Sequence, residues 1–257
     1  MSIHHTASEA ARLNQNHLIS ELQQSGIAKG NQFVNGILGA KGGLFVVVGP
    51  AGSGKAASMC AIAKDLLHIH RDTTMVIQKN QVGLESLTSL TDRLERALEI
   101  MPKFLVIKPS IETGDDMTLV IRAVEAGINV VATMRCAYKH QLLDVIPCTM
   151  TTQDRLEECL KGVLWQQAIN VVTPRPAGLY GGPVVLSSWL LTSLVGTPLQ
   201  LGSGTDAAGA MLEEGLAYVA CGAIAASELV DAFGPPAERA TRLLARLSQV
   251  ESEMTHA

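Results

Sequence analysis

Residues 43–58 read GLFVVVGPAGSGKAAS, and this stretch decides the fold. Its first part, Leu44–Val48, is a run of five apolar residues, which is typical of a strand buried on both faces. A glycine-rich loop and a lysine follow at once. The apolar spacing over 59–66 then predicts an amphipathic helix. A strand, a glycine loop, a lysine and a helix in this order predict a nucleotide-binding site in an α/β domain.

The physical reason lies in the backbone of this phosphate loop. Glycines let the chain curl so that several N–H groups point at one oxyanion, and the helix N-terminus adds partial positive charge. Lys55 would reach the outer phosphates of ATP or ADP. The alternative is a glycine-rich turn with a solvated lysine. The residues expected to bind the nucleotide are Gly49, Pro50, Ala51, Gly52, Ser53, Gly54, Lys55, Ala56 and Ala57.

One position of the loop departs from the usual motif. The residue after the lysine is normally Ser or Thr, whose hydroxyl ligates Mg²⁺. Here it is Ala56, with Ala57 next, and a methyl group cannot coordinate a metal. Ser58 lies about 200° further round the helix and is a poor substitute. The sequence therefore predicts phosphate binding and names no metal ligand.

Short apolar runs alternate with helical patterns along the chain, which predicts βαβ units and a mainly parallel sheet. One helix is expected to begin with Asp115 as its N-cap and to stop at Gly127. A strand pair joined by a Pro/Gly loop is expected at 168–172 and 183–187, and the pattern is helical after Gly204. The other expected strands are 44–48, 74–78, 104–107 and 128–133.

These patterns divide the 257 residues into a helical lead segment (1–40), a P-loop domain (41–190) and a C-terminal helical subdomain (191–257). Hydrophobic residues make up 47% and charged residues 17%, which argues against disorder. A net charge of −4 argues against direct nucleic-acid binding. The sequence shows no secretory signal and no apolar run long enough to cross a bilayer, so a cytoplasmic protein is expected.

Three stretches together resemble one protein family. GLFVVVGPAGSGKAAS is similar to the strand and loop of the type II and type IV secretion and type IV pilus ATPases, with the PilT-like retraction motors as the nearest group. Residues 114–148 and 212–233 are similar to later segments of the same family, so the resemblance spans roughly 36–233. It implies a RecA-like P-loop core with a C-terminal helical region.

Three catalytic features of that family are altered here. Its acidic box falls on residues 77–80, which read IQKN, and its Walker B strand ends on Lys108 and Pro109 in place of a Gly-Glu pair. Its histidine box falls on 133–136, with Arg135 in the histidine position. Hydrolysis needs a positioned carboxylate and a metal. The resemblance therefore implies a degenerate member in which hydrolysis is lost or very slow.

Few residues are left as catalytic candidates. Arg135 and Lys108 could bind a γ-phosphate without metal, because added positive charge partly substitutes for Mg²⁺. The alternative is that both drifted after selection on catalysis relaxed. Glu112 follows the Walker B strand as a candidate base or as a solvated loop residue. The catalytic residues are otherwise unknown.

Members of this family work as hexameric rings beneath a membrane platform. The resemblance thus implies a nucleotide-binding, hydrolysis-impaired subunit or regulator of a pilus, secretion or conjugation machine. Its partners would be further copies or a catalytically competent paralogue, and an inner-membrane platform protein that holds it at the membrane. Two alternatives stay open, an active motor ATPase and a scaffold that binds no nucleotide.

Overall fold

The computed structural model describes part of the chain. The described residues are 21, 30–78, 89–135, 155, 156, 158–169, 184–191, 204–220, 224–233, 235–242, 244 and 245, with the backbone alone in 184–191 and 204–210. Most of the expected lead segment, the loop 173–182 and the segment 136–148 lie outside these ranges.

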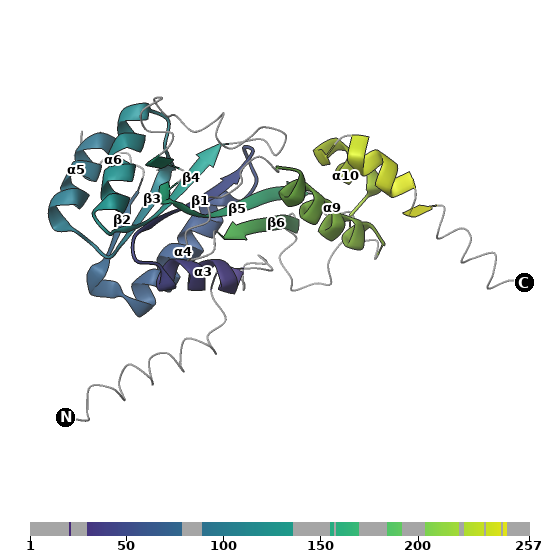
Figure 1. The fold of residues 1–257 in the computed structure, drawn as a ribbon. Coiled ribbons are helices and arrows are strands. Elements are labelled where there is room, and N and C mark those ends of the chain that lie inside the picture. The colour runs from purple at the N-terminus through teal and green to yellow at the C-terminus, as the bar shows by residue number, and fades with distance from the viewer. Residues whose placement is uncertain are drawn as a thin grey trace, which may run out of the picture.

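A six-stranded sheet in the order β2-β3-β4-β1-β5-β6 forms the centre of the fold (Figure 1). The first five strands in this order run parallel, and β6 pairs with β5 antiparallel. The α/β fold with a mainly parallel sheet is thus confirmed. The strands are β1 (Gly43–Gly49), β2 (Thr74–Ile77), β3 (Phe104–Ser110), β4 (Asn129–Arg135), β5 (Leu160–Ile169) and β6 (Val184–Leu191).

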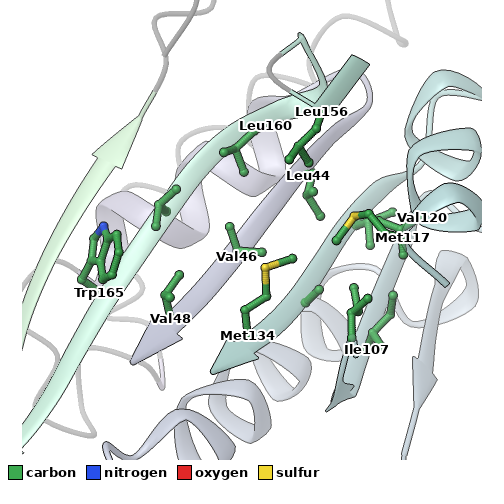
Figure 2. Close-up of a cluster of buried hydrophobic side chains, with 14 of the residues drawn as sticks. Leu44, Val46, Val48, Ile107, Met117, Val120, Met134, Leu156, Leu160 and Trp165 are labelled. Atoms are coloured by element: carbon green, nitrogen blue, oxygen red, sulfur yellow. The ribbon is translucent and has the colours of Figure 1, made fainter. Parts of the chain in front are cut away.

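Strand β1 is buried along its whole length because it lies between β4 and β5. Its side chains alternate between two hydrophobic clusters. Leu44, Val46 and Val48 join the larger cluster, which Figure 2 shows together with Met117. The neighbouring Phe45 and Val47 join the second cluster on the opposite face. The continuous apolar run in the sequence therefore reflects a strand with core on both sides.

Helices cover both faces of the sheet. Helices α3 (Gly30–Gly39) and α4 (Lys55–Ile69) contribute to the second cluster, and α5 (Leu90–Ile100) and α6 (Gly114–Glu125) contribute to the larger one. A short 3₁₀ turn, Arg71–Thr73, leads from α4 into β2. The connection after β1 therefore runs along one face, and the connection after β3 runs along the other.

Helix α6 ends where the sequence predicts, but its N-cap differs from the prediction. Gly127 (φ 94°) accepts the left-handed conformation that stops the helix, and its N–H donates to Val124 O. The prediction that Asp115 is the N-cap is wrong. Thr113 is the N-cap, and its hydroxyl accepts from the backbone N–H of Asp116 at 3.1 Å. Asp115 lies in the first turn, where a carboxylate also suits the helix dipole.

The predicted antiparallel pair exists, but its first strand is longer and earlier than expected. Strand β5 begins at Leu160 and ends at Ile169, whereas the prediction placed it at 168–172. Lys161, Gln166 and Gln167 interrupt its apolar pattern, which hid the strand in the sequence.

Two helices follow the last strand. Helix α9 (Gly204–Ala220) packs against β6, and α10 (Ala226–Phe233) packs against β5 and α9 (Figure 1). Leu229 and Phe233 of α10 belong to the same large hydrophobic cluster as the sheet. Within the described ranges, no helix is long and apolar enough to cross a membrane.

Candidate functional site

The phosphate loop lies at the carboxyl end of β1, in the middle of the sheet. The connecting helices leave from this edge on opposite faces, since α4 follows β1 on one side and α6 follows β3 on the other. In parallel sheets, ligands bind in the crevice that such diverging connections create at the carboxyl ends of the strands. The fold thus puts the loop where a ligand site is expected.

Two glycines shape the loop between strand and helix. Gly52 (φ 80°) and Gly54 (φ 88°) both take the left-handed conformation, which other residues adopt only with strain. Gly54 is also the N-cap of α4 and offers no side-chain hydrogen bond. By contrast, Ser89 caps α5 with a complete capping box, and Thr113 caps α6. Helix α4 therefore begins without the side-chain acceptor that its neighbours have.

The first backbone bond of α4 runs from the N–H of Ser58 to Gly54 O at 3.1 Å. The N–H groups of Lys55, Ala56 and Ala57 precede it and have no acceptor within the helix. Both alanines are exposed, so their N–H groups lie at an open helix end. Three such donors at a positive helix terminus suit an anionic oxygen.

Lys55 lies over its own loop. Its ammonium donates to the carbonyl oxygens of Gly49 at 2.7 Å and Pro50 at 2.5 Å, and to Ser53 Oγ at 3.3 Å. Burial, and after it the positive charge of Arg135, lowers the pKa of Lys55 below its ordinary value. An arriving phosphate can exchange for one of these acceptors and would also relieve the repulsion between the two cations.

Behind the loop lies a polar contact that the sequence did not predict. Gln166 of β5 is 1% exposed, and its Nε2 donates to Ser58 Oγ of α4 at 2.7 Å. Its backbone oxygen lies so close to Gly49 that a methyl group there would be 2.3 Å away. Two polar residues in the middle of an apolar strand were the available signal, because buried amides normally have partners.

The sequence resemblance assigns the Walker B pair to two residues of β3, neither of which carries a carboxylate. Lys108 and Pro109 stand where the resembling family has its Gly-Glu pair, and the pairing of β3 with β4 becomes irregular between Ile107 and Ser110. Pro109 has no N–H to donate to the ladder, which accounts for the irregularity. The Lys108 ammonium donates to Cys60 Sγ at 3.4 Å.

Arg135 is the exposed last residue of β4 and pairs in register with Gly49, the first residue of the loop. The structure thus brings together Lys55 and Arg135, two residues 80 positions apart in the printed numbering. Cys136 and the residues 79 and 80 of the altered acidic box lie outside the described part of the chain.

Two carboxylates that follow β3, Asp116 and Glu112, make no described contact with the loop. Asp116 is buried, and its two oxygens accept from the hydroxyls of Thr91 at 2.9 Å and Thr113 at 2.7 Å. Glu112 is exposed in the turn between β3 and α6, with no hydrogen bond or ion pair described for it. Across the described ranges, no group of three or more His, Cys, Asp or Glu side chains could hold a metal ion.

The described loop therefore offers hydrogen-bond donors and positive charge, and the described residues Ala56, Lys108 and Pro109 supply neither a metal ligand nor a base. Open N–H groups, left-handed glycines and two cations fit a polyphosphate. Ala56 cannot ligate Mg²⁺, and Lys108 and Pro109 can neither orient a water as a base nor hold the metal. The residues at these positions fit the nucleotide and do not fit its usual metal.

Comparisons with solved structures find a similar fold in two ATPases. The chain is similar to the X-ray structure of the Legionella pneumophila ATPase DotB, with a TM-score of 0.58 and 15% sequence identity over 77% of this chain and 62% of that one. It is also similar to the Yersinia pseudotuberculosis ATPase DotB, with a TM-score of 0.55 and 14% identity over 79% of this chain and 60% of that one. No protein-family model and no curated protein matches the sequence.

At these identities the likeness concerns the fold. The chain spans about three fifths of the length of the two solved ATPases that it resembles (62% and 60%). The α/β architecture is shared with them, and Ala56 on α4 and Lys108 and Pro109 on β3 are features of this sequence.

Proposed function

We propose that the chain is a nucleotide-binding, hydrolysis-impaired homologue of the type IV pilus and secretion motor ATPases. It would bind ATP or ADP at the loop Gly49–Ala57. The observation that carries this proposal is the start of α4, where Lys55 lies on the loop and the first three backbone N–H groups of the helix have no capping side chain. The impaired turnover follows from Ala56 and from Lys108 and Pro109, which replace the metal hydroxyl and the carboxylate.

The proposed role is that of a subunit or regulator of a pilus, secretion or conjugation machine. The sequence resemblance over 36–233 supports this role, and two solved ATPases, both DotB, have a similar fold. By the same resemblance, the subunit would join a ring of further copies or of a competent paralogue, beneath an inner-membrane platform protein. Nucleotide binding without turnover would then hold one conformation of such a ring.

The nucleotide part is tested by thermal stability and turnover of the purified full chain. A ligand at one hundred times its dissociation constant adds about 2.7 kcal/mol of apparent stability, which a melting curve resolves. ATP should stabilise the natural protein and leave Lys55→Ala unchanged, with no phosphate release from either. Lys41→Ala is a matched control, because Lys41 precedes β1 at the opposite end of that strand and its removal should not affect the ATP response.

Each other result supports one of the alternatives. Phosphate release that disappears in Lys55→Ala would establish an active ATPase and refute the impaired site. No stabilisation by ATP under any metal condition would refute nucleotide binding and favour a scaffold. The subunit role is tested separately by light scattering with and without ATP, alone and with a competent motor ATPase of the same cell. A chain that stays monomeric in every mixture would contradict it.

A further inference from the structure

Three basic side chains gather at the carboxyl edge of the sheet, from three different elements. Lys55 begins α4, Lys108 lies on β3 and Arg135 ends β4. Arg135 is in register with Gly49 at the start of the loop, and its charge acts on Lys55. The chain as a whole carries a net charge of −4, so this edge is basic although the protein is acidic overall.

These cations have no carboxylate partners in the part of the chain that the structure describes. Like charges that share a site repel each other and disfavour the charged state unless an anion compensates them. The ion pairs that join Lys64 to Glu21, Arg155 to Glu125 and Arg242 to Glu238 lie elsewhere in the fold. An anion bound at the loop would supply the missing negative charge.

The position of Lys108 is informative. Its ammonium lies 3.4 Å from Cys60 Sγ, and Cys60 follows Ala56 by one turn on the same face of α4. In P-loop ATPases, Mg²⁺ is held between the residue at the Ala56 position and a carboxylate on the neighbouring strand. A side-chain cation therefore lies beside the helix face on which the usual metal ligand is missing.

We propose that this site binds a nucleoside polyphosphate as the free anion, with Arg135, assisted by Lys108, supplying the positive charge that Mg²⁺ supplies elsewhere. The proposal rests on the nucleotide binding proposed above. The planar guanidinium of Arg135 can hold two phosphate oxygens at once, and Lys108 acts as a point charge. Mg²⁺ then becomes a competitor, because it occupies phosphate oxygens and removes two negative charges from the ligand.

Calorimetric titration of the full chain with ATP tests the idea, once in EDTA and once in excess Mg²⁺. The affinity in EDTA should equal or exceed the affinity in Mg²⁺. Arg135→Ala should weaken binding in EDTA by about tenfold or more, which is the usual loss for a charge-assisted hydrogen bond. Inorganic triphosphate should show the same metal and Arg135 dependence, because the proposed contacts involve the phosphates alone.

Two variants control this experiment. Arg71→Ala removes the same side chain from an exposed position before β2, at the opposite end of the sheet, and should leave the affinity unchanged. Arg135→Lys keeps the charge without the fork and should fall between the natural protein and Arg135→Ala. Arg135 is exposed, so its variants should fold, and melting curves without ligand check this.

The outcomes separate the two proposals. Binding that is tenfold or more tighter in Mg²⁺ than in EDTA would overturn metal-free recognition and leave nucleotide binding intact. Equal affinities of the natural protein and Arg135→Ala in EDTA would also overturn it. If neither ATP nor triphosphate binds under either condition, the proposed nucleotide binding fails as well.

Discussion

Replacing Gly49 by alanine should destabilise the folded protein through a steric clash, independently of any role of Gly49 in phosphate binding. The added methyl would lie 2.3 Å from Gln166 O and 2.5 Å from Ser53 Oγ, whereas ordinary contacts are about 3.5 Å. Gln166 O belongs to β5, which pairs directly with β1, so the methyl can be accommodated only if the two strands separate. Ser53 could rotate, but its hydroxyl would then leave the Lys55 ammonium.

Overpacking of a well-packed core costs about 1–3 kcal/mol. We expect the upper end, about 3 kcal/mol, because one of the two clashes is with backbone. For a domain of this size, that loss lowers the midpoint of thermal unfolding by about 6–12 °C. Urea unfolding followed by circular dichroism measures the change, with an unchanged m-value as the sign that the unfolded state is unaffected.

The matched control is Gly39→Ala. A methyl group at Gly39 would meet nothing within 4 Å, and this glycine ends α3 without a left-handed backbone. Its replacement should be neutral or stabilise by up to about 1 kcal/mol. A loss of less than about 1 kcal/mol in Gly49→Ala would refute the packing argument. If that variant kept its stability and lost ATP binding, Gly49 would instead be required for the close approach of phosphate.

Two further substitutions test the buried hydrogen bond between Gln166 and Ser58 and the missing metal ligand at Ala56. Ser58→Ala leaves the buried Nε2 of Gln166 without its acceptor and should cost about 1–3 kcal/mol in urea unfolding, and Ser58→Ala with Gln166→Leu should recover part of that loss. An additive double mutant would contradict the contact. Ala56→Thr restores the hydroxyl that ligates Mg²⁺ but should give no ATP turnover, because Lys108 and Pro109 still replace the carboxylate. Metal-dependent phosphate release by this variant would show that a base exists elsewhere.

The sequence predicts the central strands well because burial on both faces leaves a continuous apolar run. Strand β1 was expected at 44–48 and spans Gly43–Gly49, and β3 was expected at 104–107 and spans Phe104–Ser110. The start of β5 was missed because Lys161 and two glutamines break its run. A strand with one polar contact in the core has no local pattern that separates it from a loop.

The candidate site also contains residues that the sequence identifies and residues that only the fold brings together. The loop and its lysine are consecutive residues, so the sequence identifies them together. The contact between Ser58 and Gln166 joins residues 108 positions apart, and it depends on which strand lies beside β1. The same holds for Arg135, whose distance from the loop follows from the pairing of β4 with β1. Strand order is a property of the packed sheet, and no local pattern encodes it.

The positions at which this chain departs from the family that it resembles favour, in the proposed function, nucleotide binding over turnover. The N–H groups of Ala56 and Ala57 are backbone donors, so replacing a hydroxyl by a methyl removes the metal ligand and keeps the phosphate donors. On β3, the side chain of Pro109 offers no carboxylate where the resembling family has its glutamate. Relaxed selection would account for the absence of carboxylates at these positions in the proposed degenerate homologue, but it does not require positive charge at Lys108 and Arg135. Because both substitutions move the edge toward positive charge, the need for Mg²⁺ as a counterion falls with each of them.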